Sequence, residues 1–132
     1  MASRPADYVF LRSDVCTSLA ALRRHPGSIS TPAVCLEQEA CVESALRYAG
    51  ALAVLAHESQ HLRGVKVEAV AECYGRQTVP QAARAFGLDE AQAAFLAAVS
   101  YRVQYPRMPA EYRSPECVPG GALDLAGVAW LR

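Results

Sequence analysis

The chain has 132 residues, of which 52% are hydrophobic, so it is long enough to bury one compact core. Its 13 basic and 13 acidic residues balance, which leaves no net charge to attract nucleic acid or an anionic membrane. Residues 1–7 are polar, and the apolar run before His57 is interrupted by Arg47 and Gly50, so we expect neither an export leader nor a membrane-spanning segment. These features predict a single cytoplasmic domain, residues 1–132, that recognises its partners locally.

The N-terminal third of the chain predicts short extended segments and one helix. Residues 8–11 are apolar, with β-branched and aromatic side chains, and Asp14 is placed to cap a helix that extends to about residue 24. Residues 28–36 are consistent with an extended edge strand that is broken by Pro32. We therefore expect a mainly α fold with at most a small N-terminal sheet; an α+β fold is the alternative.

A long helix predicted for residues 39–63 contains a His-Glu-x-x-His motif. Histidines spaced four apart project from one face of an α-helix, so His57 and His61 can bind one metal ion. Glu58 lies beside them and is placed to act as the general base for a water molecule that the metal activates. The alanine- and leucine-rich sequence before the motif favours a buried helix. The motif therefore predicts a Zn²⁺ site with its own base.

A catalytic zinc needs a third protein ligand, and two carboxylates, Glu68 and Glu72, follow His61. On an unbroken helix Glu68 would lie about 10 Å beyond His61. Gly64 accepts the backbone conformation that ends a helix, so a second helix starting near residues 65–67 can return Glu68 to the metal. Glu68 and Glu72 share a face of that helix, so one can bind the metal while the other orients a histidine. Because Glu68 comes first after the turn, we expect it to be the ligand.

Residues 78–104 predict two further helices separated by Gly87, with Pro80 in the first turn of one and Asp89 capping the other. This arrangement resembles a helix-turn-helix, which makes a DNA-binding module the competing hypothesis. However, residues 89–100 are mostly Ala, Phe, Leu and Val and offer few side chains that read base edges. We therefore expect the second of these helices to lie in the core, and we expect no nucleic-acid partner.

The motif and the helix after it resemble those of the zincin metallopeptidases. Residues 68–72, with the sequence Glu-Ala-Val-Ala-Glu, are similar to the Glu-x-x-x-Asp helix of the gluzincins. Residues 55–77 and 112–117 also resemble small actinobacterial proteins that carry a His-Glu-x-x-His motif. The chain departs from the gluzincins in having Glu72 in place of Asp and a shorter linker after the second histidine.

The resemblance implies a compact zincin-like helical domain and assigns a role to each residue of the site. It implies that His57, His61 and Glu68 bind zinc and that Glu58 is the general base. It also implies that a substrate peptide is bound along an extended segment at residues 33–36.

A zincin also needs a hydrogen-bond donor that stabilises the oxyanion opposite the metal. Residues 105–121 are rich in proline and glycine and predict a loop without regular structure, and long loops often line sites. Tyr105, Tyr112 and Arg113 are the candidate donors in this loop. The alternative for each of them is a packing or surface role.

The five cysteines show no paired C-x-x-C spacing of the kind found in structural zinc ribbons. Without a leader, reduced thiols in the cytosol are the expectation. The alternative is an exported protein with one or two disulfides and a free thiol. Cys73 is expected to be a buried apolar residue, and it is also an alternative third ligand.

These features together predict a zinc-dependent hydrolase, most simply a peptidase in which water activated by the metal attacks a peptide bond. The substrate is expected to be a peptide or a small molecule. Two alternatives keep the metal. One is a non-proteolytic metalloenzyme that uses zinc, iron or another divalent ion to modify a peptide or small molecule, and the other is a metal-stabilised binding protein without turnover.

Overall fold

The computed structural model describes residues 8–30 and 32–125, and residues 1–7, on which the expectation of a missing leader depends, lie outside the described part. Within the described ranges the chain is helical and contains no strand, which confirms the predicted mainly α class. No helix in this part of the chain is long and apolar enough to cross a membrane. The elements in chain order are α1 (Ser13–Arg24), η1 (Pro26–Ser28), α2 (Pro32–Leu36), α3 (Glu39–Leu62), α4 (Glu68–Ala85), α5 (Glu90–Ala98), the π-helix η2 (Val99–Gln104), η3 (Tyr105–Arg107) and η4 (Ala110–Tyr112).

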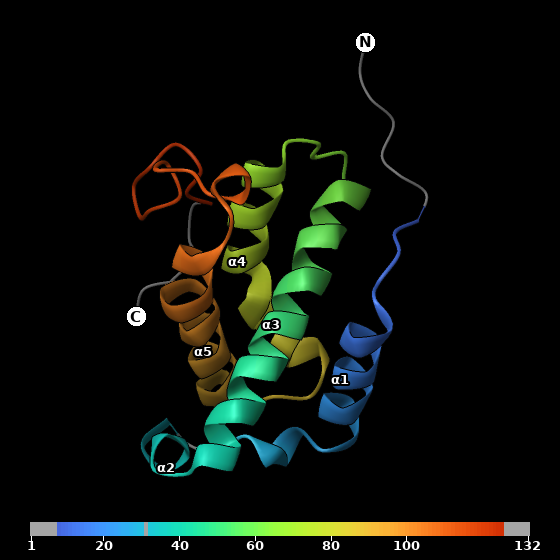
Figure 1. Ribbon diagram of the computed structural model, residues 1–132, viewed down its shortest axis with the longest axis vertical. Helices are drawn as coiled ribbons and strands as arrows, with labels where there is room; N and C mark the ends of the chain where they lie inside the picture. Colours follow the sequence, from blue (N-terminus) through green and yellow to red (C-terminus); the bar gives the residue numbers. More distant parts are fainter. Residues whose placement is uncertain (1–7, 31, 126–132) are drawn as a thin grey trace.

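The 24-residue helix α3 forms the axis of the molecule (Figure 1). Helices α1, α4 and α5 each pack against α3, and the short α2 lies at the end of the molecule where α3 begins (Figure 1). Small side chains on α3 allow the neighbouring helices to approach closely. The residues that α3 buries in the core include Ala45, Ala49, Leu52, Ala53 and Ala56.

Helix α4 approaches the backbone of α3 closely at Gly75. A Cβ atom at this position would lie 2.9 Å from the backbone nitrogen of His57 and 3.0 Å from its Cα. Any larger residue would therefore push the two backbones apart. The missing side chain of Gly75 brings α4 against the turn of α3 that carries the first histidine of the motif.

The predicted long helix is confirmed as α3, which ends one residue earlier than expected. Gly64 has a φ of +96°, the conformation expected of a glycine that ends a helix. The N–H of Val65 donates to the carbonyl of Gln60 at 3.0 Å and closes the turn. Helix α4 then begins at Glu68, so the chain reverses direction within a few residues and α4 returns along α3.

The expected edge strand at residues 28–36 is wrong, and residues 8–11 also form no strand. Pro32–Leu36 forms the helix α2. Proline is favoured at the first position of a helix because its φ is already helical and its missing N–H needs no partner there. A disulfide between Cys35 and Cys41 ties α2 to the first turn of α3. This segment therefore presents no strand edge to a substrate.

The expected start of a new helix near residue 78 is also wrong, because α4 continues through Pro80 as one helix. Val79 and Ala83, on either side of the proline, are fully buried against the core. Their packing outweighs the one backbone hydrogen bond that a proline inside a helix removes. The hydroxyl of Thr78 also donates to a carbonyl of the preceding turn at 3.0 Å.

The predicted cap of the next helix is confirmed. The side chain of Asp89 accepts from the backbone N–H of Gln92 at 2.8 Å, and the side chain of Gln92 accepts from the backbone N–H of Asp89 at 2.9 Å. Helix α5 buries Ala93, Leu96 and Ala97, as expected for a helix that lies in the core. It then continues directly into the π-helix η2.

Four of the five cysteines form disulfides, Cys35 with Cys41 and Cys73 with Cys117, while Cys16 is free and exposed. These bonds correct the expectation of reduced thiols and agree with the alternative of one or two disulfides and a free thiol. They also remove Cys73 as an alternative ligand, because its sulfur is bonded to Cys117.

Candidate metal centre

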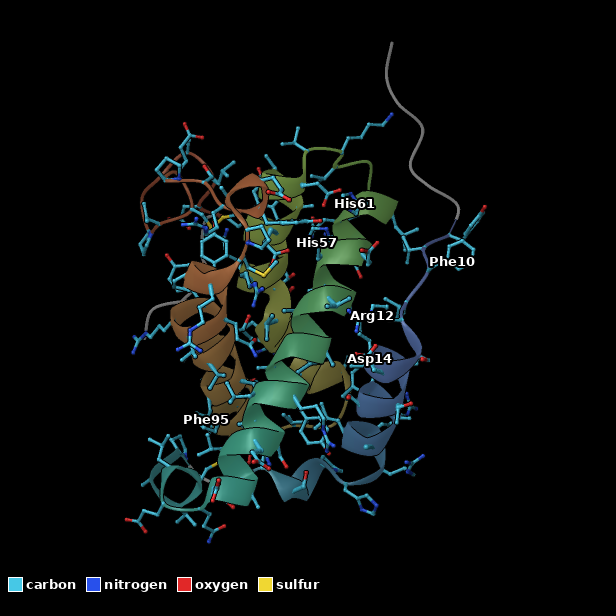
Figure 2. The ribbon with its side chains drawn as sticks, in the orientation of Figure 1. Phe10, Arg12, Asp14, His57, His61 and Phe95 are labelled. Atoms are coloured by element: carbon cyan, nitrogen blue, oxygen red, sulfur yellow. A yellow bond between two sulfur atoms is a disulfide. The ribbon has the colours of Figure 1, made fainter. Side chains whose placement is uncertain are left out.

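The last turns of α3 and the first turns of α4 carry the candidate site. His57 and His61 lie one turn apart near the C-terminal end of α3 (Figure 2). The turn at Gly64 reverses the chain, so Glu68, the first residue of α4, lies against the two histidines and Glu72 follows one turn later. The hairpin of α3 and α4 therefore brings together the four side chains that the motif and its spacing predict.

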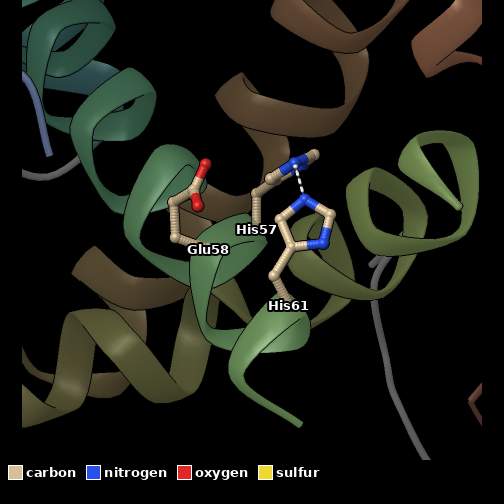
Figure 3. Close-up of side chains that lie close together, drawn as sticks. All are labelled: His57, Glu58 and His61. Carbon is tan, nitrogen blue, oxygen red and sulfur yellow. Dashed lines mark hydrogen bonds between the residues drawn. The ribbon is translucent and has the colours of Figure 1, made fainter. Parts of the chain in front are cut away.

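Three groups converge on one point between the two helices. Nε2 of His57 lies 3.0 Å from Nε2 of His61, a contact marked in Figure 3. Oε2 of Glu68 lies 2.9 Å from Nε2 of His57, and Oε1 of Glu68 lies 3.3 Å from Nε2 of His61. The His57 side chain is 8% exposed, whereas that of Glu68 is 46% exposed. Solvent therefore reaches the convergence point from the side of Glu68.

The outer nitrogen of each imidazole already has a partner. Nδ1 of His57 donates to the Glu72 carboxylate at 2.6 Å, and Nδ1 of His61 donates to the backbone carbonyl of Val65 at 2.7 Å. A neutral imidazole carries one proton, so both Nε2 atoms are left with lone pairs that face each other. Such an arrangement requires a cation at the convergence point, either a metal ion or a proton.

Carboxylates dominate the electrostatics of the site. Burial by itself would lower the pKa of His57, but the hydrogen bond to Glu72 and the negative charges of Glu72, Glu68 and Glu58 raise it. Burial by itself would raise the pKa of Glu72, but its interactions with His57 and Arg76 lower it. Glu72 is therefore an ionised carboxylate beside His57, and the site attracts positive charge.

The arrangement of these atoms fits a tetrahedral metal site. Ligand atoms about 2.0–2.1 Å from a zinc ion lie roughly 3.3–3.4 Å from one another when the angles are tetrahedral. The two Nε2 atoms are 3.0 Å apart and Oε2 of Glu68 is 2.9 Å from Nε2 of His57, so both separations are slightly shorter than this value. Oε1, the other oxygen of Glu68, lies 3.3 Å from Nε2 of His61. Two imidazoles and one carboxylate also form a ligand set of known catalytic zinc sites, which keep the fourth position for water or substrate. His57, His61 and Glu68 could therefore hold Zn²⁺, with Glu72 behind His57.

Glu58 lies beside the two histidines on α3 (Figure 3). One of its carboxylate oxygens lies within 4.8 Å of a ring nitrogen of each histidine, so by distance alone Glu58 is also a candidate ligand. Glu68 approaches both rings more closely. We therefore interpret Glu68 as the better ligand of the two, which leaves Glu58 next to the site and able to accept a proton.

A cleft of about 710 Å³ opens at the site and is lined by His57, Glu58 and Glu68. Its volume is within the range of about 300–1,000 Å³ that is typical of small-ligand sites. Side chains of the C-terminal segment, including Met108, Pro109 and Tyr112, form part of the same wall.

Only one of the three candidate oxyanion donors borders this cleft. The ring centroid of Tyr112 lies 6.0 Å from that of His57. Tyr105 is buried, and its hydroxyl accepts from the backbone N–H of Ser114 at 2.9 Å, so it holds the C-terminal segment together. Arg113 donates to a carbonyl of its own loop at 2.7 Å and is not among the residues that line the cleft.

Arg76 was not predicted as part of the site. Its guanidinium is buried and donates to the oxygen of Glu72 that does not contact His57, with N···O distances of 2.6 and 2.7 Å. Its position four residues after Glu72 is the signal that could have identified it, because opposite charges at this spacing pair on a helix. Arg76 therefore supports Glu72 from the side away from His57.

Comparison of the chain with known protein families, with curated proteins and with solved structures finds no match. The likeness to zincins therefore rests on the motif and its spacing.

Proposed function

We propose that the protein is a zinc-dependent hydrolase of the zincin type that acts on a peptide or amide bond. One observation carries the proposal: the Nε2 atoms of His57 and His61 meet the Glu68 carboxylate at distances of 2.9–3.3 Å. The other ring nitrogen of each histidine is already bonded, to Glu72 or to the backbone of Val65. Two Nε2 atoms that converge with a half-exposed carboxylate match the ligand set of known zinc sites, so we favour a metal ion over a proton at this point.

Each residue of the site has a distinct role in this proposal. His57, His61 and Glu68 would hold the zinc ion, which would supply Lewis-acid chemistry for activating water and polarising the carbonyl group of the substrate. Glu58 accepts a proton from the attacking water and returns it to the departing amine. Tyr112 donates a hydrogen bond to the carbonyl oxygen as it becomes negatively charged.

The cleft suits a short peptide or a small molecule as substrate. Val54, Met108 and Pro109 line it and offer apolar contacts beside the polar centre. Because residues 33–36 belong to helix α2, the substrate would be held by these walls and not as an added strand. The substrate-binding mode suggested by the zincin resemblance therefore does not apply to this segment.

Metal content is the first test of the proposal. We expect protein purified without added metal to contain about one zinc per chain by elemental analysis, since a single tetrahedral set is present. His57→Ala and His61→Ala should remove the zinc and lower stability, because a metal bound only by the folded state stabilises that state. His25→Ala is the matched control, since His25 is exposed at the end of α1. Unchanged zinc content in the two motif variants would refute the metal site.

Glu58→Gln separates metal binding from catalysis. The substitution keeps the shape of the side chain and removes the base, so zinc should be retained while hydrolysis falls by a factor of roughly 100 or more. Cleavage of a peptide library, followed by mass spectrometry, measures the loss. Undiminished cleavage would exclude Glu58 as the base, and loss of zinc would make it a ligand instead.

We also propose that the protein functions in an oxidising compartment or outside the cell, in place of the cytosolic location expected from the sequence. Both disulfides join cysteines that are buried. Disulfides of this kind persist in oxidising environments and are rare in the cytosol.

A further inference from the structure

Arg76 is a buried cation with no part in the proposed reaction. Its side chain is 5% exposed and lies on α4, one turn after Glu72. Nε and Nη2 of Arg76 donate to Oε1 of Glu72 at 2.7 and 2.6 Å. Burial of a guanidinium has a large desolvation cost, which is recovered only when its pairing geometry is good. The burial of Arg76 therefore depends on its contacts with Glu72.

The two oxygens of Glu72 are divided between two partners. Oε1 accepts from Arg76, while Oε2 accepts the Nδ1 proton of His57 at 2.6 Å. The terminal torsion of a glutamate is broad, so a carboxylate held at one oxygen can rotate, whereas one held at both cannot. Arg76 therefore determines the direction in which Glu72 presents its acceptor to His57.

Ser100 holds Arg76 from the other side. Nη1 of Arg76 donates to the carbonyl oxygen of Ser100 at 3.0 Å and to its hydroxyl at 2.9 Å. Ser100 is fully buried and belongs to the π-helix η2, so the guanidinium connects α4 to a separate element. Segments of π-helix are rare and are found frequently at functional sites.

We propose that Arg76, held by Ser100, is a positioning residue of the metal centre: it fixes the Glu72 carboxylate, which in turn fixes the tautomer and ring orientation of His57. The inference rests on the proposed zinc site. The contacts run from Ser100 to His57 without a gap, and each is 3.0 Å or shorter. Without Arg76, Glu72 can turn away, and His57 loses the bond that directs its Nε2 toward the metal.

The contacts require a guanidinium. Arg76 uses all three of its nitrogens, two toward Glu72 and one toward Ser100. A lysine offers a single ammonium nitrogen without the planar fork. Arg76→Lys therefore keeps the positive charge but not the full set of contacts. This variant separates the effect of orienting Glu72 from the effect of the charge.

A zinc competition titration against a chromophoric chelator, on the full chain, tests the inference. Arg76→Met should weaken zinc binding about ten- to a hundredfold, the loss typical of groups that orient a metal ligand. The zinc affinity of Arg76→Lys should lie between that of Arg76→Met and that of the unaltered protein. Ser100→Ala removes the hydroxyl contact and keeps the carbonyl contact, so its loss should be smaller than that of Arg76→Met.

Gln77→Met is the matched control. Gln77 is the next residue on α4, is 1% exposed, and donates to the carbonyls of Cys73 and Leu123 and not to Glu72. Its replacement removes buried hydrogen bonds from the same helix without touching the contacts between Ser100 and His57. We expect its zinc affinity to equal that of the unaltered protein.

A second readout uses the metal-free protein. The Nδ1 proton of His57, bonded to the Glu72 carboxylate, should give a slowly exchanging downfield NMR signal that is absent from His57→Ala. The signal should broaden or disappear in Arg76→Met and persist in Gln77→Met. A role for Arg76 that is only structural would not change this signal selectively.

The outcomes are distinguishable. An Arg76→Met protein that binds zinc with unaltered affinity, or equal losses in Arg76→Met and Gln77→Met, would overturn the positioning role and leave the zinc site intact. Absence of zinc binding by the unaltered protein would overturn the proposed function and this inference with it. If Arg76→Met does not fold, Arg76→Lys and Ser100→Ala decide: unaltered zinc affinity in both overturns the inference, and graded losses support it.

Discussion

The two histidines of the candidate metal centre are held by different acceptors. His57 donates to the buried carboxylate of Glu72, and His61 donates to the backbone carbonyl of Val65. An ionised acceptor makes the ring that it binds more basic toward a metal, whereas a neutral carbonyl mainly fixes the ring orientation. We therefore expect His57 to contribute more of the zinc affinity than His61.

Glu68 and Glu72 should respond differently to substitution. Glu68→Ala should lower zinc affinity far more than Glu72→Ala, for which a loss of about ten- to a hundredfold is expected. In the metal-free protein, the free energy of unfolding should show the opposite order, with the larger loss in Glu72→Ala. Glu72→Ala leaves the charge of Arg76 buried without its partner, which costs about 3–5 kcal/mol, while the Glu68 side chain is 46% exposed and its loss should cost little.

Zinc competition titration and denaturant unfolding of the metal-free variants measure the two effects separately. A larger loss of zinc affinity in Glu72→Ala than in Glu68→Ala would move the third ligand to Glu72.

At the level of elements, the hairpin of α3 and α4 depends on two glycines with different roles. Gly64 has a positive φ and lets the chain reverse after the second histidine. Gly75 lets α4 lie directly against the backbone of His57. The first glycine determines where α4 begins, and the second determines how close its carboxylates come to the histidines.

Gly75→Ala should separate the two helices at the site. The added Cβ would stand 2.9 Å from the backbone nitrogen of His57, a clash that no side-chain rotation relieves. We expect a destabilisation of about 1–3 kcal/mol, as for other overpacked cores. Zinc binding should also weaken, because Glu68 and Glu72 move with α4.

Gly50→Ala is the control for this prediction. Its Cβ would meet only the side chain of Gln104, at 3.5 Å, so the change should stabilise α3 by roughly 0.5–1 kcal/mol. Denaturant unfolding and zinc titration of both variants make the comparison. Equal behaviour of Gly75→Ala and Gly50→Ala would contradict the close packing at His57.

At the scale of the whole molecule, two disulfides link separate elements of the fold. One ties α2 to the start of α3, and the other ties the C-terminal segment to α4 next to Glu72. The second disulfide packs with Tyr105 in a small apolar cluster. The segment that carries Tyr112 is therefore anchored to the helix that carries Glu68 and Glu72.

The two disulfides should differ in their contribution to stability. Replacing Cys73 and Cys117 by Ala should cost about 4 kcal/mol, because that bond closes a loop with a sequence separation of 44. Replacing Cys35 and Cys41, with a separation of 6, should cost about 2.4 kcal/mol. Denaturant unfolding measures both losses.

Alkylation of protein isolated from its own cells should modify Cys16 alone, and modification of all five cysteines would place the protein in a reducing compartment.

The features that the sequence determined by itself are those that depend on near neighbours in the chain. The long helix, its end at Gly64 and the cap at Asp89 each rest on hydrogen bonds or side-chain preferences that span about one helical turn. The periodicity of the helices and the reversal of the chain at Gly64 were enough to predict that Glu68 would return to the histidines. The structure brings its carboxylate to within 2.9 and 3.3 Å of their ring nitrogens.

Other features were decided only by the tertiary structure. The unbroken course of α4 through Pro80 and the pairing of the cysteines depend on which surfaces meet in the core. The contact of Arg76 with Ser100 joins residues 24 positions apart on different elements, so no local pattern specifies it. Local preferences are small compared with the free energy of packing, and packing therefore decides wherever the two disagree.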